Sequence, residues 1–93
     1  MSTIDSKKHT ISYEIVTPDG PFGSGEASYI SLPGADGRFG VMPMHTSMIA
    51  VLEPGVMSYQ DQNGTTTLEI GYGTVKIDRN RAIILTAFAK QQL

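Results

Sequence analysis

The sequence contains no cysteine, few charges and no long hydrophobic run. The absence of cysteine excludes disulfide bridges and thiolate metal sites, and it fits a reducing compartment. Seven Lys and Arg stand against nine Asp and Glu, for a net charge of −2. Their scatter along the chain gives no basic patch for nucleic acid. The longest uninterrupted apolar run is the five residues from Met48 to Leu52, against about 20 for a membrane-spanning helix.

Signals for targeting and for helices are missing as well. Residues 1–10 are polar and lack the apolar run of a signal peptide. No segment places apolar residues at the 3.6-residue spacing of an amphipathic helix. A chain of 93 residues is expected to form one domain. Such a domain buries roughly 60–65% of its unfolded surface, which favours a modest core and no deep enclosed active site.

What the sequence does contain is a series of short apolar patterns separated by turn residues. In the clearest one, Ile11, Tyr13 and Ile15 alternate with Ser12 and Glu14, as in a half-buried strand. The predicted strands cover residues 10–16, 22–26, 27–32, 39–42, 48–52, 56–60, 65–72, 75–78 and 82–86. A single small sheet could not bury enough apolar surface. The series therefore predicts an all-β fold, an antiparallel two-sheet β-sandwich or flattened barrel of about 8–10 short strands.

The strand patterns also predict burial and turn geometry. Residues 48–52 are apolar throughout, so we expect both faces of this strand to be covered. Leu68, Ile70 and Tyr72 share one face of their strand. Asn63-Gly64 predicts a hairpin turn, because both residues accept positive φ.

The β-sandwich domain is predicted to span residues 10–87. A flexible N-terminal leader, residues 1–9, precedes it, and a C-terminal tail, residues 88–93, follows it. The composition of residues 87–93 is compatible with the start of a helix. No shift in composition marks a linker or a second domain within the chain.

Residues 32–45 stand out by composition. They include three glycines, two prolines and one of the two histidines of the chain. Glycine allows backbone angles that other residues avoid, and proline fixes φ and removes a hydrogen-bond donor. We therefore expect a shaped loop between strands, with a short strand in its second half. Its exposed side chains available to a partner would be Asp36, Arg38 and His45.

No motif for catalysis or cofactor binding is present. Residues 20–25 are glycine-rich, but no helix follows them to bind a phosphate. His9 and His45 are too few and too far apart in sequence for a metal site. Asp36 and Glu53 give no sign of a shared pocket, so neither is assigned to acid–base chemistry. The residues thus indicate a non-enzymatic β module, without metal or cofactor, that acts through its surface.

Five blocks of sequence follow the order and spacing of one known domain. They are residues 14–20, 32–45, 52–56, 70–77 and 82–87. The most specific block combines Leu-Pro-Gly, Phe-Gly-Val and Pro-x-His. Together the blocks resemble the N-terminal β-sandwich of the epsilon subunit of the F-type rotary ATP synthase, which is called delta in mitochondria. The resemblance covers residues 10–90, nearly the whole chain.

The resemblance implies a non-catalytic subunit of the central stalk, which helps couple ion flow to ATP synthesis or hydrolysis. In this family one face of the sandwich binds the gamma subunit, and one end binds the membrane rotor ring of c-subunits. The residues that match the ring-contacting loop are Ala35, Asp36, Gly37, Arg38 and Phe39. The residues that match the gamma contact are Thr17, Met44 and His45.

The resemblance also implies a location and an absence. We expect a peripheral protein, attached only through partner subunits to the cytoplasmic face of the bacterial inner (plasma) membrane or to a thylakoid or other coupling membrane. Family members usually carry a second domain of two helices that can block rotation and, in some relatives, bind ATP. Because the sequence ends at Leu93, we expect this chain to lack that helical inhibition and that ATP site.

Three places in the sequence depart from the family pattern, and other functions remain as alternatives. A Ser-Gly-Gly is common in the family where this chain has residues 70–73. Met44 stands where the family usually has glycine, and Arg38 stands where an acidic or polar residue is frequent. The main alternative is a stand-alone β-sandwich adaptor in another assembly. A small hydrolase or carbohydrate-binding protein is a third possibility, but no constellation of residues supports it.

Overall fold

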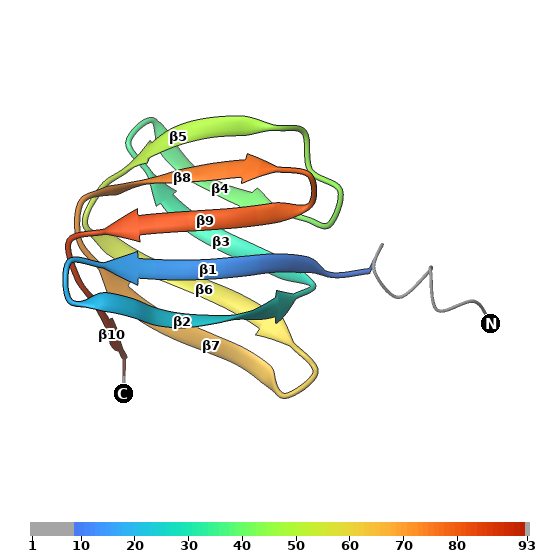
Figure 1. The fold of residues 1–93 in the computed structure, drawn as a ribbon, viewed down its shortest axis with the longest axis horizontal. Helices are drawn as coiled ribbons and strands as arrows, with labels where there is room; N and C mark the ends of the chain where they lie inside the picture. The colour runs from blue at the N-terminus through green and yellow to red at the C-terminus, as the bar shows by residue number, and fades with distance from the viewer. Residues whose placement is uncertain (1–8, 93) are drawn as a thin grey trace.

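The computed structural model describes residues 9–92, which form ten strands and no helix (Figure 1). The strands are β1 (Ile11–Thr17), β2 (Gly20–Ala27), β3 (Tyr29–Gly34), β4 (Gly37–Val41), β5 (Met48–Leu52), β6 (Gly55–Asp61), β7 (Gly64–Ile70), β8 (Gly73–Asp78), β9 (Arg81–Thr86) and β10 (Ala89–Gln91). The predicted all-β fold is confirmed.

The strands form two layers packed face to face. Their hydrogen-bonded order is β10-β7-β6-β3-β5-β8-β9-β1-β2, with β4 on β3. In Figure 1 the front layer contains β5, β8, β9, β1 and β2, and the rear layer contains β4, β3, β6, β7 and β10. The path crosses between layers where the end of β3 pairs with β5 through Gly34 and Leu52. One continuous sheet thus folds over into a nearly closed sandwich.

One pair of strands departs from the antiparallel prediction. β1 and β9 run parallel, with Ser12 opposite Arg81 and Val16 opposite Leu85. All other pairs in the described part of the chain are antiparallel. Sequence patterns alone do not reveal such a pairing, because its two strands lie far apart in the chain and no turn connects them.

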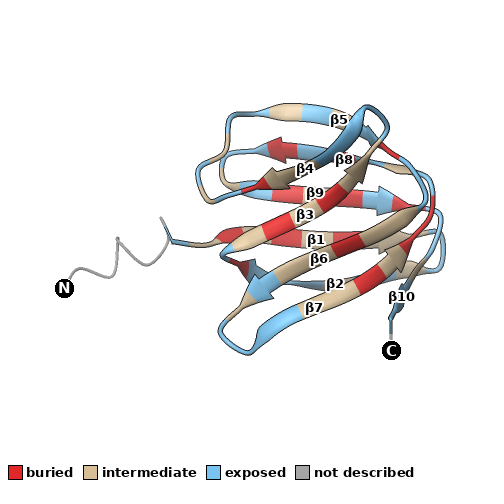
Figure 2. Ribbon diagram, turned by 180° about the vertical axis from the view of Figure 1, so that it is seen from behind, coloured by how far each residue is buried: buried red, intermediate tan, exposed pale blue. Residues whose placement is uncertain are grey.

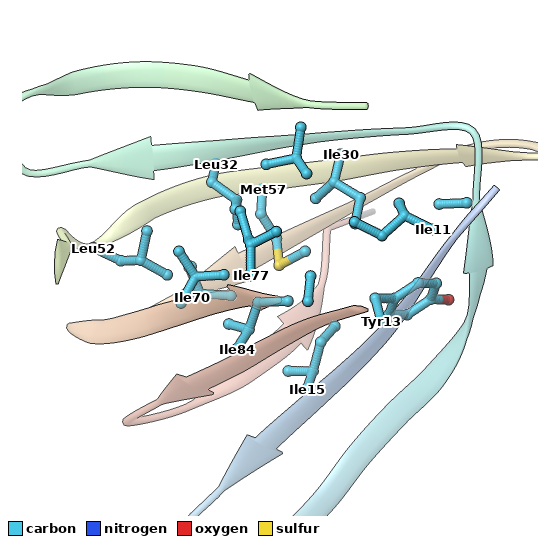
Figure 3. Close-up of a cluster of buried hydrophobic side chains, with 14 of the residues drawn as sticks. Ile11, Tyr13, Ile15, Ile30, Leu32, Leu52, Met57, Ile70, Ile77 and Ile84 are labelled. Carbon is cyan, nitrogen blue, oxygen red and sulfur yellow. The ribbon is translucent and has the colours of Figure 1, made fainter. Parts of the chain in front are cut away.

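The core lies between the layers and follows the alternation of the strands (Figures 2 and 3). Ile11, Tyr13 and Ile15 point inward from β1, as predicted. The other buried apolar residues are Ala27, Ile30, Leu32, Val41, Leu52, Met57, Leu68, Ile70, Val75, Ile77, Ala82 and Ile84. Burying a side chain of Ile or Leu size stabilises a fold by roughly 1.5–3 kcal/mol, so this cluster carries most of the favourable free energy.

Two burial predictions are wrong. β5 is covered on one face only, because Ile49 and Val51 point outward and are exposed. Tyr72 does not continue the inner face of β7, which ends at Ile70; it lies exposed in the following turn. In both cases an apolar side chain that the pattern assigns to the core is exposed on the surface instead.

Three hairpin turns are followed by a glycine, whereas the β8–β9 turn places Arg79 and Asn80 at positive φ. Gly20, Gly37 and Gly64 have φ of 114°, 127° and 114° and begin the second strand of their hairpins. The hairpin predicted at Asn63-Gly64 is confirmed. Its expected geometry is wrong, because Gly64 has a positive φ and Asn63 does not. A type I turn followed by glycine explains this pattern.

The segment 32–45 is only partly a loop. β3 extends to Gly34 and β4 runs from Gly37 to Val41, so the first ten residues form a tight hairpin around Ala35 and Asp36. Met42 lies outside the strand, in the loop that leads to β5. The predicted short strand through Phe39 and Val41 is confirmed as part of β4, whereas the loop predicted before it is wrong except for the turn at residues 35–36.

The C-terminal residues form a strand and not the beginning of a helix. β10 pairs with β7 through Ala89, Lys90 and Gln91, and the predicted tail thus contributes to the rear layer. The predicted flexible leader falls on residues 1–8, which lie outside the described residues, and on His9 at the edge of the sheet.

Gly73 provides a test of how closely β8 and β9 approach. A Cβ at this position would lie 2.0 Å from the carbonyl oxygen of Leu85. We expect Gly73→Ala to lower the free energy of unfolding by about 3 kcal/mol or more, because backbone must move. The measurement is urea denaturation followed by circular dichroism. Gly23→Ala on β2 is the control, since no atom lies within 4 Å of a Cβ there. Equal stability of the two variants would contradict the close approach.

Candidate functional site

The structure separates the candidate contact residues between two ends of the sandwich. One end carries the turns at residues 18–19, 35–36, 53–54 and 71–72, and we call it the hairpin end. It lies on the left in Figure 1. Ala35, Asp36 and Thr17 lie there. The opposite end carries the loop 42–47 and the turn 79–80, with Met44 and His45.

The β3–β4 hairpin presents its turn to solvent. Ala35, Asp36 and Gly37 are exposed, whereas the Phe39 ring is half-buried and packs against the core. The turn is braced by the β5–β6 corner beside it, where the Ala35 amide donates to the Val51 carbonyl oxygen at 2.9 Å. The tip of the hairpin is therefore rigid. Its exposed residues 35–37 are the ones that can contact a partner.

Arg38 does not extend from the tip with Asp36. Its Nη1 donates to the Ser31 Oγ at 2.7 Å, and its Nη2 donates to the Val56 carbonyl oxygen. The guanidinium thus lies back over the outer surface of the rear layer, bound to β3 and β6. It remains exposed, so it can donate hydrogen bonds to a partner's carboxylate. That partner would lie at the side of the sandwich and not at its end.

Thr17 has a local structural role in the β1–β2 turn. Its Oγ1 donates to the Gly20 carbonyl oxygen at 3.2 Å and accepts from the Asp19 amide at 3.2 Å. The side chain is only half-buried. It therefore shapes the turn and still reaches the surface of the hairpin end.

Met44 and His45 are held by a turn from another part of the chain. Met44 has a φ of 64°, a region that costs a non-glycine residue on the order of 1–2 kcal/mol. Its amide donates to the Asn80 Oδ1 at 2.8 Å, while the Asn80 Nδ2 donates to the Thr10 carbonyl oxygen at 2.8 Å. The His45 Nδ1 donates to the Thr46 carbonyl oxygen at 2.7 Å. This bracing fixes the backbone from which the exposed Met44 side chain projects.

An exposed apolar surface covers the outside of the front layer near the hairpin end. We call it the apolar face and define it by Ile49, Val51, Tyr72 and Leu85, which are 73%, 59%, 70% and 49% exposed. Val51 of β5 lies opposite Thr74 of β8, and Thr74 lies opposite Leu85 of β9. Leu85 in turn lies opposite Val16 of β1. The register thus aligns Val51, Thr74, Leu85 and Val16 in one row across four strands.

A shallow hollow of about 410 Å³ adjoins this row at the hairpin end. Its lining includes Thr17, Pro18, Tyr72 and Leu85. Thr17, a residue assigned to the gamma contact, therefore borders the apolar face. β5 runs from the loop that holds Met44 and His45 to the same end. Its outward side chains connect the two groups of candidate residues along one side of the molecule.

Sequence reasoning missed the apolar face, although a signal for it was present. The outward positions of β8 are polar Thr74 and Lys76. A neighbouring strand that is apolar on both faces, as β5 is, then has no apolar strand face beside it on the outside to cover Ile49 and Val51. Apolar side chains that are both exposed and contiguous often mark a surface that binds a partner.

The described residues carry little chemistry beyond surface contacts. Burial, followed by a hydrogen bond with Tyr59, raises the pKa of Tyr13 above its usual value. The phenol therefore stays protonated and packs against Tyr59, with ring centroids 4.6 Å apart. Within residues 9–92, no three His, Asp or Glu side chains are grouped as a metal site would need. The same residues include no helix with the length and apolar character to cross a membrane.

Comparison with known proteins gives consistent matches. A family described as the ATP synthase, Delta/Epsilon chain, beta-sandwich domain matches residues 10–92. The ATP synthase epsilon chain of Campylobacter fetus subsp. fetus is 44% identical over 78 residues, covering 83% of this chain and 60% of the relative. That of Campylobacter curvus is 41% identical over 73 residues, covering 77% of this chain and 57% of the relative. The chain thus spans about three fifths of the length of these curated relatives.

Solved structures share the fold at low sequence identity. A chain of the Euglena gracilis mitochondrial ATP synthase (OSCP/F1/c-ring) aligns with a TM-score of 0.83 and 19% identity, covering 89% of this chain and 54% of that one. A chain of the Tetrahymena thermophila mitochondrial ATP synthase (central stalk/c-ring) aligns with a TM-score of 0.74 and 16% identity, covering 91% and 69%. The family match spans the whole described sandwich, and the chain therefore belongs to the ATP synthase delta/epsilon family, as its β-sandwich domain.

Proposed function

We propose that this chain acts as the sandwich domain of a central-stalk subunit of the epsilon type. It binds the gamma subunit through the apolar face and the adjoining loop 42–45, and it binds the c-ring through the hairpin end. It performs no chemistry itself and reaches the membrane only through these partners, on the cytoplasmic side in a bacterium. The observation that carries the proposal is the apolar face, which a free-standing domain would expose to water.

The gamma contact is supported by continuity along one side of the sandwich. Met44 at one end and Thr17 at the other are joined by the outward side chains of β5. A stable interface buries about 1,600 Å² in total, which a small domain can supply only over a whole face. The strained backbone of Met44 agrees with a role in binding, since such strain is often retained at functional positions.

The ring contact is supported by the rigidity and polarity of the hairpin end. Asp19, Asp36 and Glu53 occupy three of its turns and are exposed. Hydrogen bonds between the β3–β4 turn and the β5–β6 corner hold Asp36 in position. Charged residues at an interface rim steer association and fix orientation. The two hydrogen-bonded layers carry both this end and the apolar face. They form a stiff body through which torque can pass.

Val51→Glu tests the gamma contact. A carboxylate in the middle of the apolar face must lose its water on binding, so we expect the dissociation constant for gamma to rise about tenfold or more. The measurement is titration calorimetry with the protein's own gamma subunit. Thr65→Glu is the control, because Thr65 is exposed on β7 in the rear layer. Binding that is lost equally in both variants would argue against a contact through this face.

Asp36→Lys tests the ring contact in the assembled synthase. The side chain is exposed in the hairpin turn, so the fold should tolerate the change. We expect ATP-driven ion pumping to fall several-fold while ATP hydrolysis by the detached catalytic sector is unchanged, since charge complementarity at the rim is reversed. Asn63→Lys places the same charge at the same turn position of the β6–β7 hairpin, at the opposite end, and should leave pumping intact. Normal pumping with Asp36→Lys would refute the ring contact.

A further inference from the structure

Lys76 places one cation in the middle of the apolar face. It points outward from β8, where it is exposed. In the sheet register it lies opposite Ile49 of β5 on one side and Ile83 of β9 on the other. The neighbouring row toward the hairpin end is formed by Val51, Thr74 and Leu85. The ammonium group therefore has apolar neighbours on both sides, and toward the end that carries the turn 79–80 its neighbour on β8 is the exposed Asp78.

Arg81 and Asp78, two other charged residues of this surface, have polar partners within the chain. Arg81 Nη2 lies 3.4 Å from Glu14 Oε1. Asp78 Oδ1 accepts a hydrogen bond from Ser47 Oγ at 2.8 Å. Lys76 forms no ion pair with any of the residues that the structure describes, and neither does Arg79 in the turn beyond it. Of these two, only Lys76 lies between outward isoleucines.

A partner that covers Ile49 and Ile83 must also remove water from Lys76. An ammonium group that is buried without a counter-charge loses far more free energy than its contacts return. The long side chain can move its charged end toward the rim, but Ile49 and Ile83 flank it along the row. The surface thus favours a partner that supplies an anion at this position and rejects one that is apolar throughout.

We infer that the partner surface which covers the apolar face is itself apolar and carries one Asp or Glu that meets Lys76. This inference rests on the proposed gamma contact and adds the chemistry that gamma must present there. The apolar contacts supply area, and the ion pair sets the register of gamma along β8. Lys76 is a specificity-determining residue in this arrangement, since a single charge within an apolar patch is satisfied in one docking position only.

The experiment measures binding of the full natural protein to its own gamma subunit at low and high salt. We expect Lys76→Glu to weaken binding about 100-fold, because two carboxylates then face each other. Lys76→Met, which matches its apolar neighbours, should bind within about tenfold of the wild type. It should also lose most of the salt dependence that the ion pair confers on association. Thr65→Glu on β7 of the rear layer is the control, because Thr65 is exposed away from this face, and it should bind as the wild type does.

Reversal of the partner's charge identifies the acid. One Asp→Lys or Glu→Lys substitution in gamma should restore binding of Lys76→Glu at least tenfold, and the others should not. If the wild type binds gamma, Val51→Glu does not, and all Lys76 variants bind like the wild type at every salt concentration, the acid is absent and this inference fails alone. If the wild type does not bind gamma, the proposed function fails and the inference with it.

Discussion

The parallel pairing of β1 with β9 is the constraint on which the rest of the structure depends. It joins the first strand to one near the other end of the chain through five residue pairs. Without it, β1 and β2 would pair only with each other, and Ile11, Tyr13 and Ile15 would no longer be held against the rest of the core. The same pairing puts Val16 beside Leu85 on the outside. Core and candidate binding surface therefore depend on one ladder of backbone hydrogen bonds.

Close approaches at both ends hold this ladder in place. At the hairpin end, the buried Thr86 hydroxyl donates to the Gly71 carbonyl oxygen and accepts from the Gly71 amide, both at 3.0 Å. At the other end, Asn80 joins the β8–β9 turn to Thr10 and to the Met44 amide. Thus the Asn80 side chain stabilises the strained Met44 backbone and also anchors the start of β1. It links the loop 42–47 to the β1–β9 ladder.

The apolar face gives this small domain its functional character. Contiguous exposed apolar side chains mark interaction sites, and in the proposed function a permanent neighbour covers them. In the proposed arrangement that neighbour is gamma, and Lys76 limits the positions in which gamma can dock. The hairpin end remains available for the c-ring, since it lies at an edge of the same face. Two partners can then be bound at once by a body that does not bend between them.

The amino-acid sequence by itself determined the fold class, the strands and the family, because alternation such as that of Ile11, Tyr13 and Ile15 and the block at residues 32–45 are local properties. It also predicted the hairpin at Asn63-Gly64. Only the tertiary structure decided which apolar residues stay outside, since Ile49 and Val51 differ from core residues only in what their neighbours cover. It likewise decided that the Arg38 side chain lies along the side of the sandwich. It also brought the Met44 amide to Asn80, which is distant in the sequence. Those features arise from contacts between distant segments, and no local pattern encodes such contacts.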